Sequence, residues 1–476
     1  MMLLKKIAFA ATFAACVSAY AQNAQPAQNN QAARPVTEEF SKSVIYQILL
    51  PVFTQEGTIK KAQELLPHIK ATGANIVYLC PVNVLDSDEN REVWSKRQKA
   101  SNTENPKNPY RIIDYYNIDA DVGTDADVKN FVDAAHKLGL KVIFDLVYYH
   151  CGPNAVFLKE HPNFVYRNAD GTVKLGHWKF PELNYENPEL REYMLKNMEY
   201  LMKKFDIDGY RTDVEAKVPA DFWAEGYKRI SKIKQNPIMI AESERASAQL
   251  DAYDSNYSFS WSRGVSKAFR GEKPASFIRE AWAKNNKQLP KGARVQRALD
   301  NHDTASDTED RIRYEKQFGN RGMDAVQVLN YAIDGIPFLY NGNEIADDNY
   351  VSMFSTPKHG RMFVGWENAL TDAGKRRMEL VAKLAELRRA NSALWEGETK
   401  WIDTDKPDQV LAFTRESASQ KVLAVINARN SDVEVSFPFG GELAGKLLEF
   451  GTNLSKDGGK LKVKLSPYGY FMVRYQ

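Results

Sequence analysis

The sequence has little net charge, few cysteines and no long hydrophobic run. Its 64 Lys and Arg residues nearly balance 61 Asp and Glu residues and leave +3, too little to indicate a nucleic-acid or anionic-membrane partner. Its N-terminal apolar stretch, residues 7–17, is too short for a permanent membrane span. With 43% hydrophobic residues over 476 positions, the chain can nevertheless bury the core of one large and one smaller domain.

The first 21 residues have the pattern of a signal peptide. Two lysines precede the apolar stretch 7–17, and the small residues Ala19 and Ala21 follow it. We therefore expect cleavage after Ala21 and export to the periplasm or the medium. An alternative is a lipoprotein signal in which Cys16 is lipidated and anchors the protein. Residues 22–38 are rich in Gln, Asn, Ala and Pro, which predicts a disordered tether.

Beyond residue 38, strand and helix patterns alternate. This alternation predicts a parallel (β/α)8 barrel over residues 39–393, with a short inserted loop domain at 151–187 after the third strand. Short β-patterned runs separated by turn residues then predict a C-terminal β-sandwich at 394–476. The eight expected barrel strands are 44–50, 75–79, 141–147, 207–211, 237–241, 257–261, 295–299 and 336–340.

Three acidic residues stand at or just beyond the ends of predicted strands. Asp213, Glu242 and Asp303 follow the fourth, fifth and seventh strands. Carboxyl ends of barrel strands converge on one face, so these acids are expected to share a pocket. Two carboxyl groups with separate roles are what hydrolysis of a glycosidic bond requires.

The segments around these acids resemble the conserved regions of the α-amylase family, glycoside hydrolase family 13. The similar segments follow the family's order along the chain. They are 44–48, 145–150, 209–213, 240–242, 299–303 and 335–344.

The resemblance implies roles for the three acids: Asp213 as nucleophile, Glu242 as acid/base, and Asp303 as the group that holds sugar hydroxyls and stabilises the transition state. Arg211 lies two residues before Asp213 on one strand, so we expect it to face the same way and keep Asp213 ionised. The apolar residues before Glu242 are expected to raise its pKa.

Further site residues are implied by the same resemblance. His150 and His302 resemble the pair that hydrogen-bonds the sugar, and Tyr110 resembles the stacking aromatic residue, although a packing role for Tyr110 stays open. The expected supporting residues are Asp145, which could equally be a structural ion-pair partner, Tyr340 and Glu344. Trp366 could line a sugar subsite or pack in the core.

The predicted function is retaining hydrolysis of α-1,4-glucosidic bonds in starch-derived oligosaccharides or maltodextrins. The segment 178–188 is similar to members that act on cyclodextrins, pullulan and maltodextrins. Transglycosylation at the same site, or an inactive sugar-binding or interaction protein, are the alternatives; all three carboxylates are present, which favours the enzyme. The sequence indicates neither the preference between α-1,4 and α-1,6 bonds nor the oligomeric state.

No cofactor is expected. Many amylases have Asn, a ligand of a structural calcium, where this chain has Tyr149, and segment 151–187 is short for the domain that supplies other ligands. The loop 51–58 also lacks the paired acidic residues that calcium prefers. We therefore predict no structural calcium at the usual site.

Two cysteines would remain after signal cleavage. Cys80 and Cys151 lie at the ends of the second and third predicted strands, which are neighbours in a barrel. A disulfide between them and two separate buried thiols are both compatible with the sequence.

Overall fold

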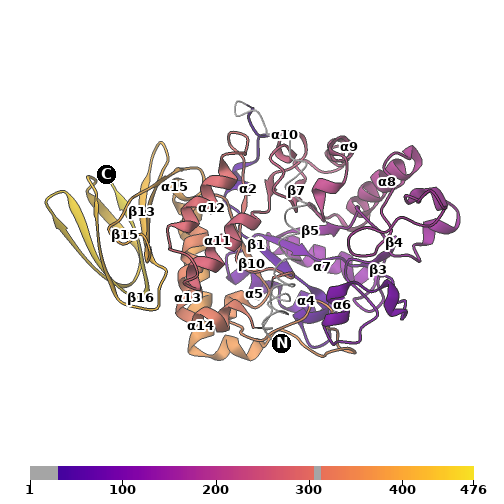
Figure 1. Cartoon of the computed structure of the whole chain (residues 1–476), viewed down its shortest axis with the longest axis horizontal. Coiled ribbons are helices and arrows are strands. Elements are labelled where there is room, and N and C mark those ends of the chain that lie inside the picture. The colour runs from indigo at the N-terminus through magenta and orange to yellow at the C-terminus, as the bar shows by residue number, and fades with distance from the viewer. Residues whose placement is uncertain (1–30, 305–311) are drawn as a thin grey trace.

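The computed structural model describes residues 31–304 and 312–476, and its centre is a parallel β-barrel (Figure 1). The strand order is β8-β7-β6-β5-β2-β1-β10-β9. A parallel bridge between Asn256 and Val295 joins the two ends of this sheet, so the barrel is nearly closed. Its strands are β1 (Ile45–Ile48), β2 (Ile76–Leu79), β5 (Lys141–Leu146), β6 (Gly209–Thr212), β7 (Ile238–Ala241), β8 (Ser255–Asn256), β9 (Gln296–Arg297) and β10 (Ile336–Tyr340).

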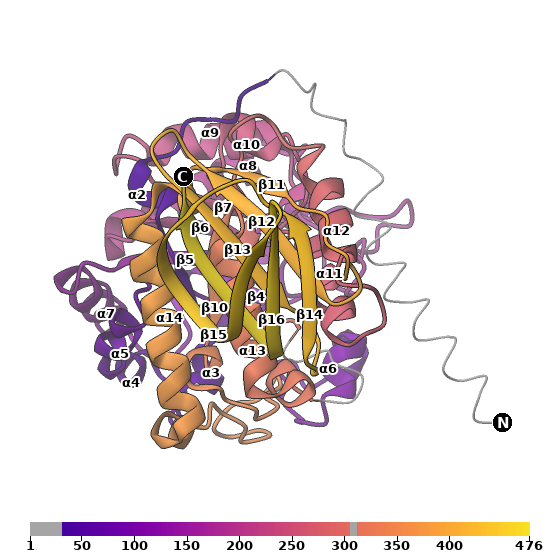
Figure 2. The same ribbon diagram turned by 90° about the vertical axis from the view of Figure 1, so that its left-hand side faces the viewer.

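Helices cover the outside of the barrel and alternate with its strands (Figure 2), which confirms the predicted barrel class. Local signals start several of them: Thr124 and Asp127 form a capping box at α7, and Asn187 caps α8 just before Pro188. The helices are α2 (Glu38–Ser41), α3 (Leu50–Phe53), α4 (Ile59–Glu64), α5 (Leu66–Ala71), α6 (Lys96–Ala100), α7 (Asp125–Lys137), α8 (Pro188–Phe205), α9 (Ala220–Ile230), α10 (Ala248–Asp251), α11 (Phe259–Phe269), α12 (Phe277–Asn286), α13 (Tyr314–Ala332), α14 (Asp372–Ala390) and α15 (Ser392–Trp395).

The sixth predicted strand, 257–261, is wrong. The strand β8 consists of only Ser255 and Asn256, and residues from Phe259 onward form helix α11. Trp261 and Val265, four residues apart, are both fully buried, as on the inner face of a helix. The apolar run was therefore the start of an amphipathic helix, whereas the true strand has polar residues that carry no β-signal.

Two excursions leave the barrel on the side of the strands' carboxyl ends. The predicted insertion, 151–187, contains two short 3₁₀ turns and isolated bridges such as Val165 to Leu183. The sequence analysis missed the other one, which lies between β2 and α7 and contains β3 (Asn83–Leu85), α6 and β4 (Ile112–Ile118). This second excursion carries Tyr110 and Arg97 to the site described below.

The C-terminal domain is an antiparallel sheet that folds over its own core. The long strand β16 pairs with β14 through residues 460–465 and with β13 through residues 470–474. Between these stretches Tyr468 has φ of 54°, and residues of β12, β13, β14 and β16 enclose one apolar core, in agreement with the predicted C-terminal β-domain. The strands are β11 (Glu398–Trp401), β12 (Val410–Glu416), β13 (Lys421–Asn427), β14 (Val433–Pro438), β15 (Leu443–Asp457) and β16 (Lys460–Tyr475).

Part of the predicted tether is bound to the barrel. The backbone of Ala33 donates to Lys291, and Arg34 forms an ion pair with Asp254 and a hydrogen bond of 2.6 Å to Tyr227. These contacts need an ordered chain, so the tether prediction does not hold for residues 31–37. The predicted signal peptide, with Cys16, and residues 22–30 lie outside the described residues.

Cys80 and Cys151 are both buried free thiols, so the structure has no bridge between them. The Sγ atom of Cys80 accepts a hydrogen bond of 3.3 Å from Gln47. Over residues 31–304 and 312–476, no helix is both long and apolar enough to cross a membrane.

Candidate active site

The two central acids stand where neighbouring barrel strands end. Asp213 directly follows β6, and its backbone N–H donates to Leu146 on β5. Glu242 directly follows β7, and its N–H donates to Thr212 on β6. The parallel ladder therefore continues one residue past the strands and fixes both side chains at the same end of the barrel.

Arg211 joins three carboxylates below this rim. Its Nη1 atom lies 2.7 Å from Asp145 and 2.9 Å from Asp213, and its Nη2 atom lies 2.9 Å from Glu242. The Arg211 side chain is fully buried. The rings of Tyr78, Tyr110 and Tyr257 surround its guanidinium at 5.3 to 5.9 Å, and their π faces favour the cation.

Burial and mutual repulsion raise the pKa of both Asp213 and Glu242. For Asp213, loss of solvent contributes most, followed by the charge of Glu242, and together they outweigh Arg211. The pKa of Glu242 is raised mainly by burial, against the lowering effect of Arg211. The expected rise in the pKa of Glu242 is present. The expectation that Arg211 keeps Asp213 ionised did not take the charge of Glu242 into account. Two like charges this close favour one shared proton.

A strained backbone position orients Glu242. Val214, directly after Asp213, has φ of 47° and ψ of 41°, a left-handed conformation that a β-branched residue rarely adopts. This conformation lets its N–H donate to Glu242 at 2.8 Å. Such strain costs on the order of 1–3 kcal/mol and persists only where surrounding structure imposes it, commonly at functional sites.

Asp303 is the third acid and differs from the other two. Arg97, from the excursion after β2, donates to its carboxylate at 2.6 Å and to its backbone oxygen at 2.8 Å. Burial opposes its ionisation, but the neighbouring His302 ring and the charge of Arg97 lower the pKa of Asp303 below its ordinary value. The site thus combines one firmly ionised carboxylate with a pair that retains a proton.

A hydrogen-bonded chain connects His302 to Asp145. The backbone N–H of His302 donates to Oε1 of Gln47, which leaves the Gln47 amide to donate to Nδ1 of His302 at 2.7 Å. The Nε2 atom of His302 then donates to the Tyr110 hydroxyl at 2.6 Å, and Tyr110 donates to Asp145 at 2.9 Å. Burial lowers the pKa of His302 to about 4, consistent with this neutral form.

Tyr110 and His150 form the wall beside this chain. The Tyr110 ring stacks on His302 with centroids 5.2 Å apart. Nε2 of His150 donates to the Tyr110 backbone oxygen at 2.8 Å, while its Nδ1 atom is buried with no hydrogen-bond partner in the described protein. Burial lowers the pKa of His150 to about 4, so Nδ1 is an uncharged acceptor without a partner among the described residues.

The remaining predicted residues support the frame. Glu344 is fully buried and accepts hydrogen bonds from Tyr46 at 2.7 Å and from the backbone of Gly342 at 3.1 Å. Tyr340 lies at the end of β10, where the guanidinium of Arg313 approaches its ring at 5.5 Å. Trp366 donates to the backbone of Phe53 at 2.7 Å and packs on its ring, which identifies it as a packing residue.

Sequence reasoning missed four residues of this site. Gln47 stood inside the first quoted segment, 44–48, where a buried polar residue in an apolar strand is a usable signal. Tyr78 likewise lies in a buried strand and donates to Asp145 at 2.6 Å. Arg97 and Tyr257 had no local signal, because their places depend on the path of the excursion after β2 and on the short strand β8.

No group of three His, Cys, Asp or Glu side chains within the described ranges is placed to hold a metal ion. The hydroxyl of Tyr149, at the position where many amylases have a calcium ligand, donates to Glu182. The absence of a structural calcium stays a prediction, and chelation tests it below.

Comparison with known proteins places the chain in a family. The family model described as the alpha amylase catalytic domain matches residues 27–170 and 168–379, and that of the maltogenic amylase C-terminal domain matches residues 400–472. A cyclomaltodextrinase from Bacillus sp. is 25% identical over 398 residues, which are 78% of this chain and 65% of the relative. Neopullulanase 2 from Thermoactinomyces vulgaris is 25% identical over 441 residues, 87% of this chain and 70% of the relative.

The fold agrees with these matches. A noncanonic maltogenic alpha-amylase from Thermotoga neapolitana superposes with a TM-score of 0.77 at 23% identity, covering 92% of this chain and 99% of the other. The chain spans about 65% of the length of the cyclomaltodextrinases that it matches. The catalytic-domain model nevertheless covers most of the described barrel, together with all three carboxylates. The chain therefore belongs to the α-amylase family.

Proposed function

We propose that the protein is a retaining α-glucan hydrolase that cleaves α-1,4-glucosidic bonds in maltodextrins. The observation that carries the proposal is the arrangement around Arg211: Asp213 and Glu242 share its guanidinium and both have raised pKa values, while the pKa of Asp303 nearby is lowered. A two-carboxylate displacement needs one protonated and one ionised group in the same pocket.

The reaction begins from the state in which Glu242 carries the shared proton. Asp213 attacks the anomeric carbon while Glu242 protonates the departing glycosidic oxygen, which gives a covalent glycosyl–Asp213 ester and a free sugar end. Glu242 then removes a proton from water, and the resulting nucleophile cleaves the ester and restores both carboxyls. The charge of Asp303 stabilises the positive sugar ring formed in both steps.

Maltodextrins are the proposed substrates for two reasons. The relatives that match over most of this chain include proteins named cyclomaltodextrinase, neopullulanase and maltogenic alpha-amylase. A neutral sugar also suits a wall in which His150 and His302 are uncharged at neutral pH. Hydrogen-bond acceptors and aromatic rings then provide the recognition, without a need for a charged ligand.

The test is incubation with maltoheptaose, a cyclodextrin and pullulan, followed by separation of the products. Asp213→Asn and Glu242→Gln should each remove nearly all hydrolysis, whereas Asp221→Asn, a change at an exposed ion pair, should leave it intact. Substantial turnover by either active-site variant, or none by the wild type on any of the three glucans, would refute the proposal.

We also propose that the protein is exported after cleavage behind Ala21, on the basis of the N-terminal sequence alone. N-terminal sequencing of protein recovered from the cell envelope or medium should begin at Gln22. A blocked N-terminus at Cys16 carrying a lipid would support the lipoprotein alternative instead.

A further inference from the structure

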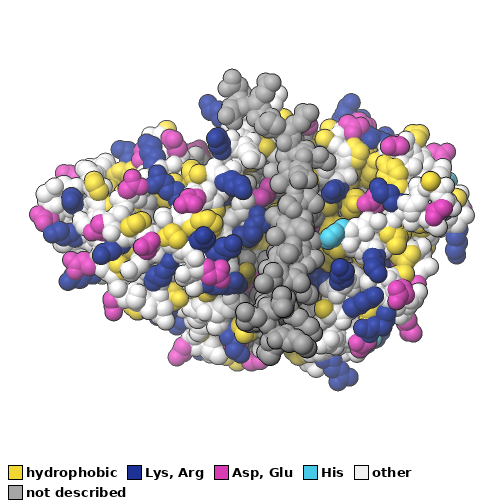
Figure 3. Space-filling view, viewed as in Figure 1, with side chains coloured by type: hydrophobic (Ala, Val, Ile, Leu, Met, Phe, Trp, Pro, Cys, Tyr) yellow, Lys and Arg dark blue, Asp and Glu magenta, His cyan; other side chains and the backbone are white. Residues whose placement is uncertain are grey.

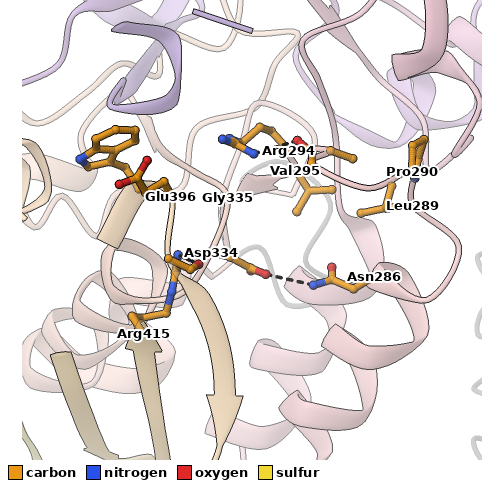
Figure 4. Close-up of a pocket in the computed structure, with 13 residues that line it drawn as sticks. Asn286, Leu289, Pro290, Arg294, Val295, Asp334, Gly335, Glu396 and Arg415 are labelled. Atoms are coloured by element: carbon orange, nitrogen blue, oxygen red, sulfur yellow. Dashed lines mark hydrogen bonds between the residues drawn. The ribbon is translucent and has the colours of Figure 1, made fainter. Parts of the chain in front are cut away.

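A cavity of about 220 Å³ lies at the opposite end of the barrel from the carboxylates. Arg294 and Asp334 border it from the segments that enter β9 and β10, and Arg415 reaches it from β12 of the C-terminal domain. Figure 4 shows the Asn286 amide pointing at Asp334, with Arg415 approaching from a strand of the sheet domain. The cavity thus lies at the junction of the two domains.

Positive charge predominates around this cavity. Arg294 and Arg415 line it, and Arg297 and Arg388 lie close behind. Burial first, and then the charges of Arg415 and Arg294, lower the pKa of Arg388 to about 9. Burial likewise lowers the pKa of Arg415 to about 10; the charge of Asp334 opposes this, and those of Arg297 and Arg294 add to it.

The negative groups nearby do not balance these four cations. Asp334 already accepts hydrogen bonds from Trp282 and Asn286 and forms an ion pair of 2.5 Å with Arg297. Glu396 lines the cavity but is exposed to solvent, so its charge is screened. Two carboxylates against four guanidinium groups leave a net charge of +2, and like charges in a partly buried space repel one another.

Each of these guanidinium groups has one nitrogen without an acceptor, while its other nitrogens donate to protein oxygens. The Nε atoms of Arg294, Arg388 and Arg415 are buried and make no hydrogen bond within the described residues. The Nη1 atom of Arg297 is also buried and makes no hydrogen bond within the described residues. Arg415 is only 1% exposed, so solvent screens its charge weakly. Buried guanidinium groups whose charge is not balanced are costly, and an anion in the cavity would offset that cost through its own charge.

We propose that this cavity, named the junction cavity, binds a small oxyanion of the phosphate type and links the sheet domain to the barrel. A tetrahedral oxyanion presents several acceptor oxygens at once, which suits guanidinium groups that arrive from different directions. Its double negative charge equals the excess positive charge. The site is distinct from the proposed catalytic centre, since it lies at the amino ends of β9 and β10.

Calorimetric titration and thermal unfolding of the whole protein test this proposal. Inorganic phosphate and sulfate probe the free anion, and glucose 1-phosphate probes a phosphate ester. We expect saturable 1:1 binding of at least one of these probes, with a melting temperature that rises until saturation. Sodium chloride at equal ionic strength should not reproduce that rise. No saturable binding of any probe, or an equal rise with chloride, would overturn the proposal.

Variants locate the binding. Arg294→Gln removes a donor and a charge from the junction cavity and should weaken the affinity at least tenfold. Lys291→Gln removes the same charge from an exposed position three residues earlier and should leave the affinity unchanged. Maltoheptaose hydrolysis by both variants should equal that of the wild type, which shows that they fold. Equal affinities of Arg294→Gln and Lys291→Gln for every probe would place the anion elsewhere.

Discussion

Replacing Arg211 by Gln should destabilise the protein in a way that depends on pH. The guanidinium is fully buried and contacts Asp145, Asp213 and Glu242 at 2.7 to 2.9 Å. Removing one partner from a buried ion pair costs on the order of 3–5 kcal/mol, because the other charge stays buried without compensation. Three carboxylates lose their cation here, so at pH 7.5 we expect a loss at the upper end of that range.

The sign of the pH dependence follows from the direction of the pKa changes. Without Arg211, which lowers the pKa of Asp213 and Glu242, both values rise further above those of the unfolded chain. At pH values below the pKa values of the unfolded chain, the carboxyls are protonated in both the folded and the unfolded state, so the variant loses the least stability. As pH rises, the unfolded carboxyls ionise while the folded ones stay protonated, so stability falls by up to about 1.4 kcal/mol per pH unit for each such group.

Thermal and urea unfolding of wild type and variant at pH 4.5 and 7.5 measure this difference. The gap in free energy of unfolding should be clearly larger at pH 7.5. Arg229→Gln is the matched control, because Arg229 pairs with Glu192 and Glu225 near the surface; it should lose at most about 1 kcal/mol, as exposed pairs do. A gap for Arg211→Gln that is the same at both pH values, or larger at pH 4.5, would refute the reasoning.

Three further predictions address the rest of the site. Arg97→Ala removes a partly exposed partner of Asp303, so the free energy of unfolding should change by less than about 1 kcal/mol. The pKa of Asp303 should rise, so activity should fall first on the acid side of the pH profile. An unchanged acid side of the profile would contradict this. Chelation with EDTA should leave activity and melting temperature unchanged, and a drop restored by calcium would reveal a metal site. Thiol titration of the denatured, unreduced mature protein should find two free thiols per chain, and none would mean that Cys80 and Cys151 are bridged.

The barrel and its rim of acids were predictable because both depend on local pattern. Side chains two residues apart on a strand face the same way, which placed Arg211 beside Asp213, and this contact is present at 2.9 Å. Both acids directly follow buried β-patterned runs, so their convergence follows from the parallel barrel alone. The strand β8 was not predictable in this way, because its residues are polar and give no apolar pattern. Its Asn256 can be buried because its side chain forms hydrogen bonds with Gln249 and with the backbone of Ser243.

Two properties of the site depend on tertiary contacts and had no local signal. Arg97 reaches Asp303 across a separation of 206 residues, through an excursion whose path the sequence does not indicate. The raised pKa of Asp213 depends on its burial and on the charge of Glu242, a neighbour on another strand, whereas reasoning along one strand considered only Arg211. Charge balance in a pocket is a sum over all strands and cannot be read from one of them.

The most direct test of the central claim is the anomeric form of the first product released from maltoheptaose, followed by NMR before mutarotation equilibrates the sugars. Two successive displacements, first by Asp213 and then by water activated by Glu242, retain configuration, so the account predicts the α-anomer. Initial release of the β-anomer would show a single inverting displacement and would contradict the roles assigned to Asp213 and Glu242.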